Sequence, residues 1–266
     1  GKKRERKGRM LPNVLRKDLL VLRYEGLDEV TREARIQFAP EPLEITASQA
    51  TFDIELDPKG ETTVAVMVAC DVGDSHRPLL AYDAAMAEAG LAFGAEQTED
   101  CTIQTSNAQF NEWWNRSVLD VRMMVTDTNE GPYPYAGVPW FSTPFGRDGV
   151  ITALECLWIR PELARGVLAY LASTQAKEVN AGQDAEPGKI LHETRKGEMA
   201  ALNEIPFGLY YGSVDSTPLF VMLAGAYYER TADLAFIQSI WANLEVALTW
   251  MDTFGDPDRD GFVEYV

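Results

Sequence analysis

The residue types best suited to chemistry gather in residues 139–149, near the middle of the 266-residue chain. Two aromatic side chains, Trp140 and Phe141, precede an arginine and an aspartate, Arg147 and Asp148. The apolar faces of a sugar ring stack on aromatic rings, and its hydroxyls need paired donors and acceptors. The stretch therefore fits a neutral, hydroxyl-rich ligand. It fits equally a core-lining loop in which Arg147 and Asp148 form an ion pair with each other.

The shape of this stretch follows from its prolines and glycines. Pro139, Pro144, Gly146 and Gly149 oppose a long regular element. We expect a shaped loop over residues 139–149, followed by a helix that begins at Val150 and ends near Ile159.

A second polar cluster lies in residues 179–211, a long segment with little periodicity. It contains His192, Glu193, Arg195 and Glu198. No second histidine stands four residues after His192, so the zinc pattern of a helix is absent and we expect no metal there. The cluster suits a hydrogen-bonding wall for polyol hydroxyls, or else a solvated charged loop.

A third candidate is Asp215, which follows Tyr210 and Tyr211 and directly precedes a predicted helix. A carboxylate at a helix N-terminus commonly has a purely structural role. As a proton donor near neutral pH, Asp215 would need burial or a neighbouring carboxylate. The residue types alone leave both roles open.

The end of the chain carries an alternating run of acids, Asp256, Asp258 and Asp260, before Gly261. The run matches the first half of a calcium loop, but the acidic ligand expected at the twelfth position would lie beyond residue 266. An acidic turn is favoured, and calcium is kept as the alternative.

Composition limits the class of partner. Asp and Glu number 41 against 24 Lys and Arg, giving a net charge of −17, which disfavours nucleic acid and anionic membranes. The basic run at residues 1–9 is expected to be a solvated strand or loop rather than a nucleic-acid arm. The three cysteines have no metal or redox spacing, so a reducing cytoplasm is expected. The oligomeric state stays open.

Hydrophobic periodicity predicts three parts. Residues 1–77 carry period-2 alternation, including Phe52–Leu56, typical of an antiparallel sheet in a sandwich. Residues 78–105 form an Ala-rich helical connector and a linker. Residues 106–266 carry helical spacing, with a cap at Ser106 or Asn107, a start at Pro161, a start at Thr217 or Pro218, and a last helix over residues 233–253. The predicted helices are joined by alternating short and long connections, as in an α/α toroid. A helical-repeat solenoid is less favoured, because no sequence repeat of fixed period is found.

Four motifs together resemble the bacterial amylo-α-1,6-glucosidase (glycogen debranching enzyme-like) family. They lie at residues 135–149, 190–193, 211–218 and 260–265. The resemblance covers essentially the whole chain. It implies an N-terminal β-sandwich, a catalytic (α/α)6 barrel, inverting hydrolysis of α-glucosidic linkages in glycogen-like α-glucans, and no cofactor.

The resemblance also implies roles for individual residues. Asp215 takes the place of the general acid. The expected substrate-binding residues are Trp140, Phe141, Arg147, Asp148, His192, Glu193, Arg195, Glu198, Tyr211 and Glu264. The residues around Asp215 are similar to the family pattern, not identical with it.

The (α/α)6 barrel needs six helix pairs, more than this pattern supplies, so both ends look cut from a longer protein. Inversion needs two carboxyl groups, about 6.5–9.5 Å apart. By the resemblance, the general base would lie beyond residue 266, and we expect little or no hydrolysis by this polypeptide alone. Two alternatives stay open. One is a trehalase-like or glucosyl- or mannosylglycerate hydrolase of the same fold, and the other is a non-catalytic carbohydrate-binding scaffold with Arg147 and Asp215 on opposite faces.

Overall fold

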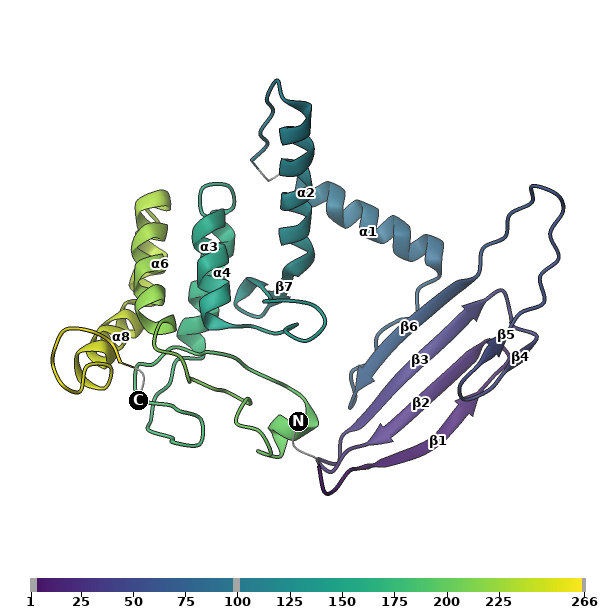
Figure 1. Ribbon diagram of the computed structural model, residues 1–266, viewed down its shortest axis with the longest axis horizontal. Coiled ribbons are helices and arrows are strands. Elements are labelled where there is room, and N and C mark those ends of the chain that lie inside the picture. Colours follow the sequence, from purple (N-terminus) through teal and green to yellow (C-terminus); the bar gives the residue numbers. More distant parts are fainter. Residues whose placement is uncertain (1–3, 98–100, 265–266) are drawn as a thin grey trace. The chain divides into compact units, whose positions relative to one another are not determined.

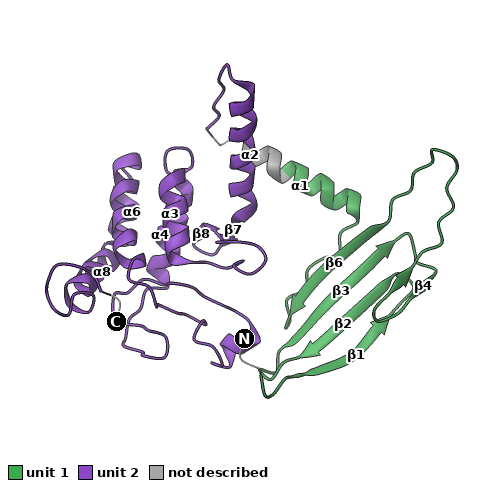
Figure 2. Ribbon diagram, viewed as in Figure 1, with its two compact units in different colours: residues 1–99 green, residues 100–266 purple. Residues whose placement is uncertain are grey.

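The computed structural model describes residues 4–97 and 101–264 and divides into two compact units, residues 1–99 and 100–266 (Figure 2). Each unit is described by itself. No helix within the described ranges combines the length and hydrophobicity that crossing a bilayer requires.

Unit 1 is built on a four-stranded antiparallel sheet, which confirms the period-2 prediction (Figure 1). The strands run in the order β1-β2-β3-β6, with bounds Arg9–Leu15, Leu19–Glu25, Thr31–Ala39 and Ala65–Val72. A small pair, β4 (Glu44–Ile45) and β5 (Ala50–Thr51), and helix α1 (Tyr82–Gln97) complete the unit.

The predicted strand over Phe52–Leu56 is wrong. Only Ala50–Thr51 pairs with a neighbouring strand, and residues 52–56 have no ladder partner in the described structure. Phe52 instead packs edge-on against Phe38, with ring centroids 6.0 Å apart, while Ile54 and Leu56 are exposed. Alternation of apolar and acidic residues over 52–56 was therefore not enough to predict a strand, because no neighbouring strand of the described structure pairs with this segment.

Unit 2 is mainly helical, and its helix starts follow the predicted signals. Helix α2 (Ala108–Met124) begins after Asn107, whose side chain accepts from the Phe110 N–H at 3.1 Å. Helix α4 (Pro161–Ser173) begins at its proline. The remaining elements are β7 (Val125–Thr128), β8 (Gly131–Pro134), α3 (Gly146–Cys156), α5 (Glu198–Ala201), α6 (Ser216–Thr231), α7 (Leu234–Ser239) and α8 (Trp241–Thr253).

Two predicted boundaries in unit 2 are wrong. The expected loop over residues 139–149 ends early, because α3 begins at Gly146 rather than Val150. Gly146 and Gly149 serve close packing: a Cβ at Gly149 would lie 2.5 Å from the Tyr133 hydroxyl oxygen. The single helix expected over residues 233–253 breaks after Ser239, whose hydroxyl donates to the Phe236 carbonyl oxygen at 2.6 Å.

The core of unit 2 lies where α3, α4 and α6 pack side by side (Figure 1). Its fully buried side chains include Leu163, Leu168 and Leu171 of α4 and Phe220 of α6. Ile190 of the long connection is also fully buried, so that segment packs into the core rather than lying in solvent. These three helices pack against one another, and the closed toroid stays a proposal.

Candidate functional site

The N-terminus of α3 lies against the long connection between α4 and α6. The Gly146 N–H donates to the His192 carbonyl oxygen at 2.8 Å, and Phe145 pairs with Glu193 in an isolated β-bridge. A Cβ at Gly146 would lie within 1.9 Å of the Leu191 carbonyl oxygen. Only glycine therefore allows the start of α3 to approach this segment so closely.

Arg147 reaches from this helix start to Asp215, at the start of α6. Its Nη1 lies 3.0 Å from Asp215 Oδ2, and the two side chains are 47% and 36% exposed. Asp215 lies at the N-terminus of α6, the position of the structural alternative, but its side chain makes no cap hydrogen bond there. The alternative in which Arg147 pairs with Asp148 is wrong, because the guanidinium is directed to Asp215.

His192 lies among aromatic rings beside this ion pair. Its ring meets those of Phe145 and Tyr210 edge-on, with centroids 5.7 and 6.0 Å apart. Burial, more than any nearby charge, lowers the pKa of His192 below its usual 6.5. The imidazole is therefore neutral near pH 7. Its Nδ1 is buried without a hydrogen-bond partner among the described residues, as is Oδ1 of Asp215.

Trp140 and Phe141 lie on an exposed loop that contacts the segment containing His192. Trp140 is 77% and Phe141 52% exposed. The Phe141 ring packs edge-on against Phe145, with centroids 5.8 Å apart. Arg195 donates to the Trp140 carbonyl oxygen at 2.8 Å and to Glu193 Oε2 at 3.0 Å. The structure thus joins the Trp140 loop to the His192 segment through main-chain and guanidinium contacts.

Asp148 and Arg147 line a cleft of about 400 Å³ between α2 and the start of α3. Its other polar lining residues are Asp120, Tyr135 and Thr152. Sequence reasoning named none of the three as a site residue, although Tyr135 begins the motif at residues 135–149. A signal existed for Thr152, which stands four residues after Asp148 and so on the same helix face. Asp120 carried no comparable signal, because its place depends on how α2 packs.

The remaining expected site residues are Tyr211, Glu198 and Glu264. Tyr211 is buried in the core, where its hydroxyl donates to the Thr174 carbonyl oxygen at 2.7 Å. Glu198 begins the short helix α5. Glu264 lies beside the terminal acidic turn, and burial, followed by repulsion from its aspartates, raises the pKa of Glu264.

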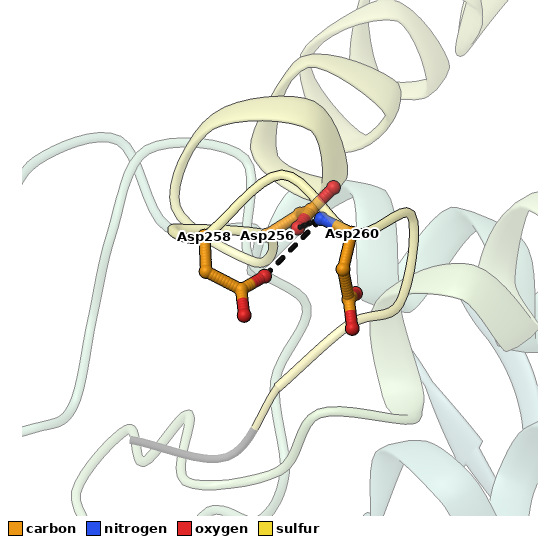
Figure 3. Close-up of side chains that lie close together, drawn as sticks. All are labelled: Asp256, Asp258 and Asp260. Carbon is orange, nitrogen blue, oxygen red and sulfur yellow. Dashed lines mark hydrogen bonds between the residues drawn. The ribbon is translucent and has the colours of Figure 1, made fainter.

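The acidic turn brings the carboxylates of Asp256, Asp258 and Asp260 within 4.8 Å of one another (Figure 3). Asp256 accepts from the N–H groups of Asp260 and Gly261, each at 3.0 Å, and Asp258 accepts from Asp260 at 3.1 Å. Main-chain donors therefore stabilise this turn, and the three carboxylates are also close enough together to hold a cation, so an acidic turn and a calcium loop both stay open.

The comparisons with known proteins bear on unit 1. Residues 1–67 match the family model described as the N-terminal domain of (some) glycogen debranching enzymes. Comparison with curated proteins gave no match. Residues 1–67 are thus an N-terminal domain of the type found in some glycogen debranching enzymes, which confirms the resemblance for this part of the chain. The match ends before the helices that carry Arg147 and Asp215.

Proposed function

We propose that this chain carries the glucose-binding part of an inverting α-glucosidase that removes α-1,6-linked branch stubs from glycogen-like α-glucans. Two independent observations support it: the family of residues 1–67, and the meeting of Arg147, His192 and Asp215 from three separate segments. The second carries the proposal, because the scaffold alternative expected Arg147 and Asp215 on opposite faces. The net charge of −17 fits a neutral polyol better than nucleic acid or an anionic membrane. We also propose a cytoplasmic location.

The polar atoms of the group are suited to sugar hydroxyls. Asp215 Oδ1 and His192 Nδ1 are buried, and neither has a hydrogen-bond partner among the described residues. Leaving a buried polar atom unpaired costs about 1–3 kcal/mol, so a ligand that pairs with it gains affinity. A hydroxyl both donates and accepts, so it suits a carboxylate oxygen and an imidazole nitrogen alike. Because both atoms are buried, pairing with a pyranose requires the side chains over them to move when the sugar binds.

The aromatic loop and the cleft supply the apolar and spatial parts of such a site. An exposed indole beside charged groups suits the apolar face of a pyranose. The cleft of about 400 Å³, with Asp148 and Arg147 in its wall, is large enough for a sugar residue and falls within the usual range of ligand pockets. We propose that glucose lies between Trp140 and this wall.

Asp215 is the proposed general acid. In the ion pair it is a carboxylate, whereas leaving-group protonation needs a proton on it. The acid role therefore requires substrate hydroxyls to take over the Arg147 contact, so that bound sugar changes the neighbourhood of Asp215. By the resemblance, the general base is expected beyond residue 266. In this proposal residues 106–266 form the first half of an (α/α)6 barrel and residues 1–77 form part of a sandwich. The connector and linker at residues 78–105 join the two. Binding is therefore the primary test.

Calorimetric titration with a panel of glucosides tests the proposal. A maltooligosaccharide with an α-1,6 glucosyl stub should bind best, and cellotetraose should not bind. Trehalose and glucosylglycerate separate the alternative substrates, and glucose release from each is followed in parallel.

Trp140→Ala should weaken stub binding about tenfold or more. Trp241→Ala, an exposed indole on α8, is the matched control. Equal effects of the two substitutions, or equal binding of cellotetraose, would contradict the proposed site.

A further inference from the structure

We infer that Arg195 is a positioning residue, which fixes the aromatic loop (residues 137–143) beside the Arg147–Asp215 pair and does not itself bind sugar. The inference rests on the proposed function, since it takes Trp140 as the sugar platform. It changes the role that the resemblance implied for Arg195, from pocket lining to support of the loop.

The guanidinium of Arg195 is already engaged with protein groups. Its Nε donates to Glu193 Oε2 at 3.0 Å, and its Nη1 donates to the Trp140 carbonyl oxygen at 2.8 Å. Its central carbon lies 5.5 Å from the centroid of the Phe145 ring. The main chain of Arg195 is held in turn by a hydrogen bond to Phe207. The side chain therefore joins one well-supported segment to the carbonyl of the platform residue.

The same segment holds the loop at two further points. The Thr143 hydroxyl donates to the Thr194 carbonyl oxygen at 2.5 Å, and Phe145 pairs with Glu193. Three consecutive residues, Glu193, Thr194 and Arg195, thus contact the residue two positions after the loop, the last residue of the loop and its middle, respectively. Trp140 nevertheless remains 77% exposed. A fixed main chain with an exposed aromatic face binds sugar without first losing loop entropy.

Arginine suits this role for a physical reason. Its planar fork donates in two fixed directions, here to Glu193 and to Trp140. The single ammonium of lysine keeps the charge beside Glu193, whose side chain is 10% exposed, but does not reproduce both bonds with the same geometry. Arg195→Lys therefore separates loss of the loop contact from loss of charge, whereas alanine would leave a buried carboxylate uncompensated.

Hydrogen exchange followed by mass spectrometry on the full chain measures the loop without any ligand. The N–H groups of Gly137 and Thr143 both donate to the Phe141 carbonyl oxygen, at 3.1 and 2.8 Å, and report loop opening. In Arg195→Lys their exchange should rise about tenfold, as expected for loss of one charge-assisted hydrogen bond, while peptides from α4 and α6 stay unchanged. Lys196→Gln, at the exposed neighbouring position, should match the wild type. Unchanged exchange in Arg195→Lys, or a rise throughout unit 2, would overturn the inference.

The affinity for the branched maltooligosaccharide, measured on the same variants, separates positioning from direct contact. Arg195→Lys should weaken binding about tenfold alone and have no further effect in a Trp140→Ala background. A further loss in that background would show that Arg195 touches the sugar, and would overturn the positioning role. If the wild type binds no α-glucan, the proposed function fails, while the exchange result still decides whether Arg195 holds the loop.

Discussion

Arg147 and Asp215, 68 residues apart in the sequence, form an ion pair with 3.0 Å between Nη1 and Oδ2. One residue lies in the first turn of α3 and the other just before α6. Both side chains are more than a third exposed, and an ion pair of this kind stabilises a fold by only about 0–1 kcal/mol. Under the proposed function, its main use is therefore ligand binding.

A double-mutant cycle tests this interpretation. We expect Arg147→Gln and Asp215→Asn to show a coupling of about 1 kcal/mol or less in the free energy of unfolding, measured with urea. Each should weaken binding of the branched maltooligosaccharide at least tenfold, because each replaces a charged protein group that hydrogen-bonds to the bound ligand. Asp252→Asn, an exposed aspartate on α8, should change neither. Large losses of stability with unchanged affinity would make the pair purely structural.

The local elements of the fold were predictable because their signals are local. Period-2 alternation indicated β2, β3 and β6, and Asn107 and Pro161 indicated the starts of two helices. The false strand at Phe52–Leu56 had the same alternation but no neighbour to pair with. The start of α3 at Gly146 was missed because both glycines resemble loop residues, whereas here they admit Leu191 and Tyr133 at close range.

The site was predictable in its residue types and not in its pairings. Arg147 and Asp215 stood out as chemistry-bearing residues, but only tertiary packing directs one to the other. Tyr211 resembled a site residue because it stands near Asp215, although its ring enters the core and its hydroxyl bonds to Thr174. Arg195 was predicted to bind the ligand, and its hydrogen bond to the Trp140 carbonyl, 55 residues away, could not be predicted from sequence spacing.

The close approach at Gly146 gives a prediction on stability. Gly146→Ala would place a Cβ against the Leu191 carbonyl oxygen, so the main chain must move, and we expect a loss of about 2 kcal/mol or more. Gly225→Ala, in an open part of α6 with no atom within 4 Å of its Cβ, should stabilise by about 0.5–1 kcal/mol. Urea unfolding of both variants checks this. Equal effects would show that the Gly146 contact is not tight in solution.

His192 gives a prediction on pH. Burial lowers the pKa of His192 in the folded state below 6.5, so the unfolded state takes up the proton first as the pH falls. The stability that depends on a neutral His192 is complete above about pH 6.5 and is lost as the pH falls through the folded pKa. The chain has two histidines, so proton NMR resolves both imidazoles, and His76→Gln assigns them.

The expected NMR result is a His192 midpoint below 6.5 in the folded protein. His192→Gln should also flatten the dependence of the unfolding free energy on pH in the interval below about 6.5. A midpoint at or above 6.5 would show that neighbouring carboxylates outweigh burial.

Asp148 allows its role in the helix to be separated from its proposed role in binding. It is the acidic residue in the first turn of α3 and also lines the cleft, whereas Glu162 is the acidic residue in the first turn of α4. A carboxylate near a helix N-terminus stabilises it by about 0.3–1 kcal/mol, so Asp148→Asn and Glu162→Gln should lower stability by similar small amounts. Only Asp148→Asn should weaken binding of the branched maltooligosaccharide, by about tenfold, because only Asp148 faces the cleft. Equal affinities of the two variants would remove Asp148 from the binding site and leave it a helix-terminal charge.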